Sequence, residues 1–390
     1  MKKRLILAII VLAVSFFSLN VTAVAAEENN NADKELSDKI NEIIDATDFS
    51  EFEKYLDESS GVLAENTDFK SLLVALAKGQ GLALDGDILK YIFSLIFIGV
   101  KNKIPILVSL FVMLVLCSVL GCFASDKPNG VSSIIKFIGY ASVACTVAMI
   151  SVSLVGAAND SCRQISKIIQ ITFPVLLAFI TASGGVSQAT IYSPTMLFLQ
   201  NFTTVYISKI LFPLISTMLA LSIISNISKC IKLQGFIDFI SSFMKWSIGL
   251  TGVLFSVMTT IKGFSAGAFD GAGIRTLKYA VGSTIPIVGG MLSGSADIVF
   301  SAITLTKNAF GILSVVILFG VVIKPVIEIA ALTFALRLVG AITQPMTDNG
   351  TYSFIKSCVS TLNFALAGIV VVALMYILTI ILIIMSSGMV

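Results

Sequence analysis

The chain has 390 residues, of which 56% are hydrophobic and only 13% charged, and its mean hydropathy is +0.97. A soluble domain carries about 25% charged residues, so this composition excludes an ordinary soluble globule and predicts a polytopic, all-α membrane protein. The sequence has no histidine, which excludes His-ligated metal sites and Ser-His or Cys-His catalytic pairs. We therefore expect no enzymatic activity, no metal and no cofactor.

The formal net charge of +3 is the sum of two unlike parts. Residues 27–90 contain 16 acidic and 6 basic residues, whereas residues 91–390 contain 17 basic and 7 acidic residues. An acidic segment followed by a membrane region biased toward Lys and Arg fits an exposed segment outside the cell and basic loops inside. The basic residues are spread singly between apolar runs, so we do not expect nucleic-acid binding.

Residues 1–26 have the pattern of a secretory signal peptide. A basic start at Lys2, Lys3 and Arg4 precedes an apolar run over residues 5–19, and small residues before Glu27 fit a cleavage site. An uncleaved first membrane anchor is the alternative. In both cases residues 27–90 are expected outside the cytoplasm.

Residues 27–90 are predicted to form a small helical segment, because apolar side chains recur in it at helical spacing. The resulting apolar faces are narrow, so the segment has little core of its own and is expected to dock on a partner or on the membrane region. The residues of these faces are Leu36, Ile40, Ile43 and Ile44, then Phe49, Phe52, Tyr55 and Leu56, then Leu72, Leu73, Leu76 and Ala77.

Residues 91–390 are predicted to be the multi-spanning membrane domain, since a helix needs about 20 apolar residues to cross the hydrocarbon core. Two further apolar pieces, 88–100 and 189–206, are re-entrant or additional spans, and 229–245 has the pattern of an interfacial amphipathic helix. The best candidate spans are 104–123, 137–158, 168–183, 210–225, 247–261, 309–335 and 362–385.

The topology stays open at this stage. Alternation through these seven spans places Lys229, Lys232 and Lys245 outside, against the positive-inside tendency. Counting 189–206 as a span moves the same loop inside.

Residues 262–311 are rich in glycine and contain Pro286, which in a membrane permits close helix approach or non-helical backbone. Gly263 to Gly267 match the G-x-S-x-G pattern of serine hydrolases, but no strand precedes them and the chain has no His partner. Close packing therefore explains these small residues better than catalysis.

Charged residues near this segment are candidates for a polar path or for structural contacts. Lys278, Asp297 and Lys307 either face a cavity or partner, or reach the membrane interface with their side chains. Lys324 and Glu328 lie one helical turn apart around Pro325, so they are a candidate intramembrane ion pair. A structural pin between helices is favoured over a point on a conducting path.

The segment from Lys278 to Ser301, followed by Lys307 to Gly311, resembles the stage III sporulation protein AE family. The residues that carry the resemblance form a candidate packing or pore-lining motif, and they are Lys278, Gly282, Pro286, Gly289, Gly290, Gly294, Asp297, Lys307, Asn308 and Gly311. The overall plan of signal peptide, extracytoplasmic segment and multi-spanning region is similar as well. The resemblance to this family implies no catalytic residues.

The resemblance implies a multi-pass component, in the mother-cell membrane around the forespore, of the secretion-like channel complex that joins the two cells. Forespore development after engulfment is then expected to need it. The implied partners, besides membrane lipid, are other stage III sporulation A-operon proteins, including a cytoplasmic ATPase and ring-forming proteins, and the stage II sporulation protein Q complex. A self-sufficient secondary transporter and a membrane scaffold without a pore are the alternatives.

We predict that replacing Gly290 or Gly294 by Leu preserves membrane insertion but abolishes sporulation, because a branched side chain would separate closely packed backbones. Asp297→Asn keeps the volume, removes the charge and is expected to be milder. The measurements are membrane protein level and heat-resistant spore counts for each variant. Normal sporulation by both Leu variants at normal protein level would show that the segment only crosses lipid.

Overall fold

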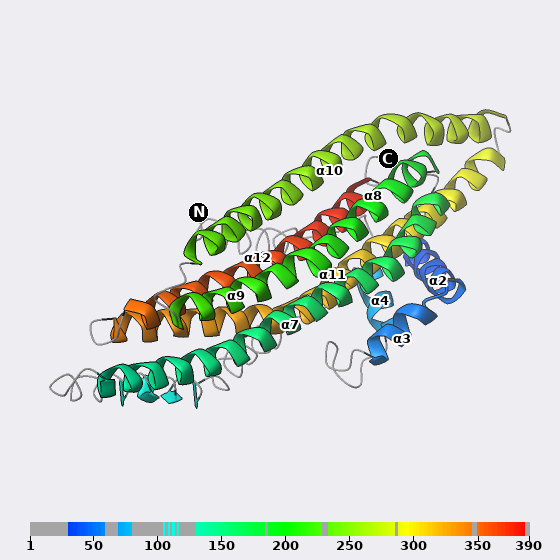
Figure 1. Ribbon diagram of the computed structural model, residues 1–390. Coiled ribbons are helices and arrows are strands. Elements are labelled where there is room, and N and C mark those ends of the chain that lie inside the picture. The colour runs from blue at the N-terminus through cyan, green and yellow to red at the C-terminus, as the bar shows by residue number, and fades with distance from the viewer. Residues whose placement is uncertain are drawn as a thin grey trace.

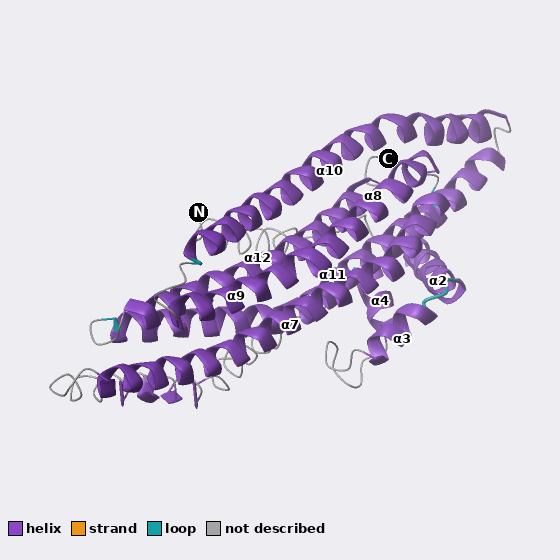
Figure 2. Ribbon diagram, viewed as in Figure 1, coloured by secondary structure: helices purple, strands orange, loops and turns teal. Residues whose placement is uncertain are grey.

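The computed structural model describes most of the chain as helices. The side chains of 262–297 and of a few helix-end residues lie outside the described part, as do residues 1–29. The described ranges are 30–58, 69–79, 130–183, 186–227, 233–284, 288–344 and 349–386, with short helical pieces within 104–116. Every regular element in these ranges is a helix, as Figures 1 and 2 show.

Long antiparallel helices form an elongated bundle, and three short helices pack beside it (Figure 1). The short helices are α2 (Asn30–Ala46), α3 (Ser50–Glu58) and α4 (Phe69–Ala77). The long elements are α7 (Gly130–Ala182), α8 (Val186–Tyr206), the π-helix η2 (Ile207–Leu211), α9 (Phe212–Ile227), α10 (Gln234–Thr284), α11 (Val288–Thr343) and α12 (Asn349–Ser386).

Within the described residues, five helical stretches are long and apolar enough to cross a membrane. These stretches are Phe137–Ala182, Thr195–Ser225, Gln234–Ile261, Ile298–Ile342 and Tyr352–Met385. The prediction of an all-α, multi-pass membrane protein is therefore confirmed. The predicted signal peptide and the span at 88–100 lie outside the described residues, and the span at 104–123 lies largely outside them.

Two pairs of predicted spans are each one continuous helical path, which corrects the sequence-based division. The predicted spans 137–158 and 168–183 both lie in α7, because the polar residues 159–167 between them include no Gly or Pro that would break a helix. Hydropathy detects a change of polarity there, although the backbone simply continues. The predicted 229–245 interfacial helix likewise lies mostly in the first turns of α10.

The second pair, 189–206 and 210–225, is joined through η2. Pro213 has no N–H to donate to the Lys209 carbonyl, and the Phe212 N–H instead bonds the Ile207 carbonyl in the wider π-turn. The helix therefore passes the proline without ending.

The N-terminal helices dock on the bundle through an aromatic cluster. Phe49, which directly precedes α3, and Phe52 of α3 lie 5.3 and 5.1 Å from Phe310 of α11, between ring centroids, and Phe69 of α4 lies 6.3 Å from it. Phe179 of α7 completes the cluster at 6.4 Å from Phe310. All five rings are buried. The apolar faces predicted from the sequence therefore pack on the membrane region, which is one of the two predicted alternatives.

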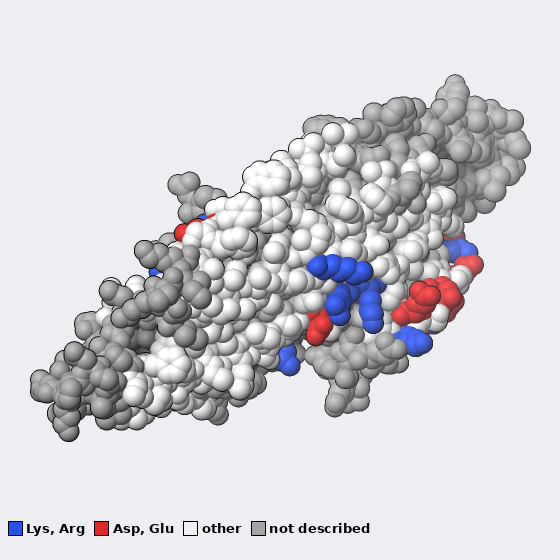
Figure 3. Space-filling view, viewed as in Figure 1, with Lys and Arg blue, Asp and Glu red and all other residues white. Residues whose placement is uncertain are grey.

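The other faces of α2 and α3 are acidic and exposed. Figure 3 shows Asp and Glu side chains gathered at this corner of the molecule, and the exposed members include Glu35, Asp38 and Glu42. Asp48 caps the start of α3 by accepting a hydrogen bond from the Ser50 N–H at 3.0 Å. Hydrogen bonds from the Ser50 side chain and backbone lower the pKa of the Asp48 carboxyl below its ordinary value.

We predict that Phe310→Ala releases the N-terminal helices from the bundle. Removing a buried phenylalanine costs about 3–5 kcal/mol, and here the loss falls on the ring that α3, α4 and α7 share. Trypsin should then cleave at the exposed Lys54 faster than in the unchanged protein, while the bundle stays intact. Phe198→Ala is the matched control, since Phe198 is 72% exposed; equal cleavage rates in both variants would contradict the docking role.

Candidate functional site

A buried lysine joins α11 to the end of α12. The Lys307 side chain is 0% exposed, and its ammonium donates hydrogen bonds to the carbonyls of Ile383 at 3.1 Å and Ile384 at 3.4 Å. Because α12 ends at Ser386, these carbonyls belong to its last turn. A cation at a helix C-terminus is favourable, because the negative end of the helix dipole lies there. Lys307 therefore caps a helix that is distant in sequence.

One turn further along α11, Gly311 allows α11 and α12 to approach closely. A Cβ atom on Gly311 would lie 2.9 Å from Cδ1 and 3.1 Å from Cγ1 of Ile384, and 3.3 Å from Cγ2 of Ile380. Real Cβ contacts are rarely that short, so a larger residue at 311 would require the Ile384 side chain to move aside. At Gly311, side chains of α12 therefore lie directly against the backbone of α11.

Lys307, Asn308, Phe310 and Gly311 together form what we call the 307–311 junction. Lys307 and Gly311 face α12, whereas Phe310 faces α3, α4 and α7 through the aromatic cluster. Asn308 is half-buried, and within the described part of the chain its Oδ1 has no hydrogen-bond partner. A single helical turn thus holds three parts of the fold together.

The other motif residues lie in the two helices on either side of Pro286. Lys278 and Gly282 belong to α10, and Gly289, Gly290, Gly294 and Asp297 belong to the first turns of α11. Pro286 lies outside the described residues, as do the side chains of the others. Their role as packing or pore-lining residues stays a prediction.

Lys324 and Glu328 both lie in the middle of α11. The Lys324 side chain is exposed and that of Glu328 is half-buried. The ion pair between them stays a prediction.

Polar contacts between the long helices were not predicted from the sequence. The Thr379 hydroxyl of α12 donates to Gln200 Oε1 of α8 at 3.0 Å, and the Tyr206 and Ser247 hydroxyls join α8 to α10 at 2.6 Å. Isolated Ser, Thr and Gln residues in apolar helices carry no sequence signal for such pairing. Within the described residues, no group of three His, Cys, Asp or Glu side chains is placed to hold a metal ion.

Comparison with known proteins gives the family that the segment from Lys278 to Gly311 resembles. The sequence profile of stage III sporulation protein AE matches residues 67–388. The chain belongs to this family. Stage III sporulation protein AE of Bacillus subtilis (strain 168) is 25% identical over 389 residues, which cover 99% of this chain and 97% of that protein. No solved structure matches the chain. Family membership implies a role in sporulation, and the 307–311 junction lies inside the matched region.

We predict that Gly311→Ala lowers the free energy of unfolding by about 1–3 kcal/mol, the usual cost of overpacking. Thermal unfolding in detergent is the measurement. Gly156→Ala is the control, because a Cβ there meets no described atom within 4 Å, so it should show only the gain in helix propensity of up to about 1 kcal/mol.

Ile384→Val tests the same contact from the α12 side, since it removes Cδ1, the atom nearest to the added methyl group. Alone it should cost about 0.5–1.5 kcal/mol, and combined with Gly311→Ala it should cost less than the sum of both. Strict additivity would show that the two residues do not touch.

Proposed function

We propose that this family member is an integral component of a secretion-like channel complex that joins the mother cell and the forespore during sporulation. Its place is the mother-cell membrane around the forespore, and forespore development after engulfment depends on it. The observation that carries the proposal is the family match over residues 67–388. Five membrane-capable helices within the described part of the chain support a component within the membrane rather than a soluble accessory.

The distribution of charge supports an orientation. Lys229 and Lys232 lie in the connection from α9 to α10, and Arg337 and Lys356 lie near the connection from α11 to α12. The helix ends that flank these connections lie at the end of the bundle away from α2, α3 and α4 (Figure 1). Basic loops stay on the cytoplasmic side, so that end faces the mother-cell cytoplasm and α2–α4 lie on the extracytoplasmic side.

This orientation assigns the two ends of the bundle to different partners. The basic end is accessible to the cytoplasmic ATPase of the same operon, which would supply the energy that this chain does not. The acidic faces of α2 and α3 are accessible to the ring-forming operon proteins and to the stage II sporulation protein Q complex, in the space between the two membranes. Membrane lipid surrounds the apolar faces between the ends.

The proposed role is structural and conductive, without catalysis. The Lys307 ammonium donates hydrogen bonds to the end of α12, and the 307–311 junction serves to pack helices together. A secondary transporter acting alone would need none of the partners above. A scaffold without a pore would bind them but leave the passage of molecules to another component.

We predict that deleting the gene stops development after engulfment and leaves vegetative growth unchanged. Heat-resistant spore counts and microscopy of sporulating cells measure this, with the restored gene as the control. A deletion strain with normal spore counts would overturn the sporulation role.

Purification from sporulating cells tests the complex itself. A tagged chain that restores sporulation should bring the operon's ATPase and ring-forming proteins with it from solubilised membranes. A functional tagged chain recovered without these proteins would favour the self-sufficient transporter.

A further inference from the structure

The middle of α7 exposes charges between two apolar stretches. The apolar segment Phe137–Ala182 has 46 residues, which at 1.5 Å per residue is about 69 Å, more than twice the hydrocarbon thickness of about 30 Å. Arg163 and Lys167 lie near its centre and both are exposed. Exposed charges are costly inside hydrocarbon, so this point of α7 marks the level of lipid headgroups or water.

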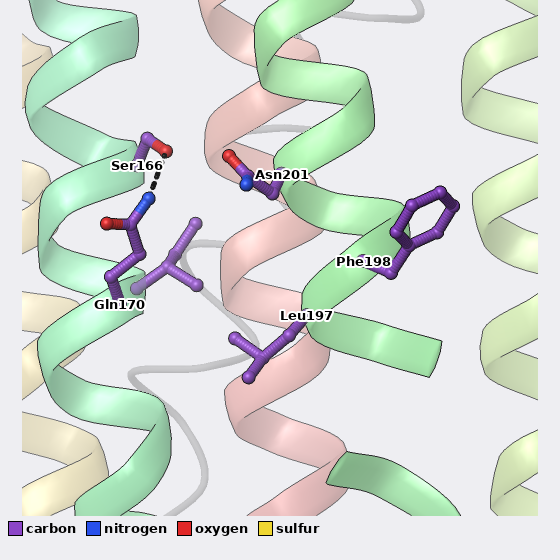
Figure 4. Close-up of a pocket in the computed structure, with 6 residues that line it drawn as sticks. Ser166, Gln170, Leu197, Phe198 and Asn201 are labelled. Carbon is purple, nitrogen blue, oxygen red and sulfur yellow. Dashed lines mark hydrogen bonds between the residues drawn. The ribbon is translucent and has the colours of Figure 1, made fainter. Parts of the chain in front are cut away.

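Next to these charges, α7 and α8 border a small, half-open pocket, the α7–α8 groove. Its volume is about 240 Å³, enough for a headgroup rather than a single water. Figure 4 shows Ser166 and Gln170 of α7 on one side and the Asn201 amide of α8 on the other, pointing toward them. The groove is lined by Ser166, Ile169, Gln170, Leu197, Phe198 and Asn201.

The charges and the groove share one face of α7. Arg163, Ser166, Lys167 and Gln170 are spaced three, four and seven residues apart, which places them along the same side of a helix. The Gln170 amide donates a hydrogen bond to the Ser166 hydroxyl at 3.4 Å, which orients both side chains within the groove. The hydrogen-bonding side chains of Ser166 and Gln170 therefore lie next to the two cations on this side of α7.

A third cation approaches from the opposite helix. The Ser208 hydroxyl of η2 donates a hydrogen bond to Asn159 Oδ1 of α7, which places the exposed Lys209 close to the charged part of α7. The π-turn is centred on Lys209, and π-turns inside helices often mark functional positions. Figure 3 shows Lys and Arg side chains gathered on this face, halfway along the bundle.

Carboxylate compensation at this site is incomplete. Asp160 Oδ1 lies 3.9 Å from Arg163 Nη1, and both side chains are more than 60% exposed, at 68% and 64%. An exposed pair of this length is weak. Among the described residues of the cluster, one carboxylate stands against three cations, which leaves two positive charges that an anion can neutralise.

The surface beside the groove is apolar and exposed. Phe198 and Phe202 of α8 are 72% and 59% exposed and stack on each other, with ring centroids 6.2 Å apart. Aromatic rings exposed in this way on a membrane protein face lipid. A basic pocket between membrane helices at the edge of an apolar surface has the chemistry of a phospholipid headgroup site.

We propose that the α7–α8 groove binds an anionic phospholipid. Its phosphodiester group would contact Arg163, Lys167 and Lys209, since guanidinium and ammonium groups bind phosphate oxygens through charge-assisted hydrogen bonds. The headgroup hydroxyls would bond Ser166, Gln170 and Asn201, and the acyl chains would leave toward lipid. This site is independent of the proposed sporulation complex.

The test is the binding of dioleoyl phosphatidylglycerol to the purified full chain, titrated in detergent and read by native mass spectrometry. Dioleoyl phosphatidylcholine, which has no net charge, serves as the reference lipid. R163Q/K167Q should bind the anionic lipid about 30-fold more weakly, since each cation near an anionic lipid contributes roughly fivefold. K209Q should lose about fivefold.

The matched control is K245Q/K356Q, which also removes two exposed cations of the bundle but away from the groove. It should bind the anionic lipid as the unchanged chain does. An unchanged affinity in R163Q/K167Q, or an equal loss in the control, would overturn the site. Gel-filtration elution identical to that of the unchanged chain establishes that each variant is folded.

Two further arms separate the parts of the proposal. N201L keeps all charges and should still lower the affinity severalfold; an unchanged affinity would remove the groove from the site. Inorganic phosphate at millimolar concentration should not displace the lipid. Displacement would show that the cations bind soluble phosphate and would overturn the lipid assignment.

Discussion

The close contact of α11 with the end of α12 is the constraint on which the other contacts of the bundle depend. A buried ammonium is costly unless hydrogen bonds compensate it, and the Lys307 ammonium donates such bonds to the carbonyls of Ile383 and Ile384. Gly311 lets α12 come near enough for those bonds to form. Together the two residues fix the register of α12 along α11.

The position of α12 along α11 allows the polar contacts between helices inside the bundle. Thr379 lies one turn before the last turn of α12 and reaches Gln200 of α8, while the Tyr376 hydroxyl donates to Thr172 of α7 at 3.5 Å. A shift of α12 by one turn would separate both pairs. The α7–α8 groove lies between the helices that these contacts position, so its shape follows from the junction even though no groove residue belongs to it.

The bundle is longer than a bilayer is thick. With 53 residues, α7 alone extends about 80 Å, against about 30 Å of hydrocarbon. Part of the bundle must therefore project beyond the lipid. The N-terminal helices, held by Phe310 and its aromatic neighbours, add to it an acidic surface. Such a projection suits a protein whose proposed role joins two apposed membranes.

The sequence by itself determined the class of the protein, its family and the local faces of its helices. Composition required a membrane protein, the Lys278–Gly311 motif identified the family, and the spacing of Phe49 and Phe52 predicted an apolar face that needed a partner. These properties are local or additive, so they can be read without knowing what any residue touches.

Only the tertiary structure decided which surfaces meet. It joined 137–158 to 168–183 in one helix, paired Lys307 with carbonyls more than 70 residues away, and placed Phe310 among rings from three other helices. Hydropathy reports whether a side chain avoids water but not which helix it packs against. In a bundle where nearly every face is apolar, that choice depends on shape and on a few buried hydrogen bonds, and these exist only once the helices are packed.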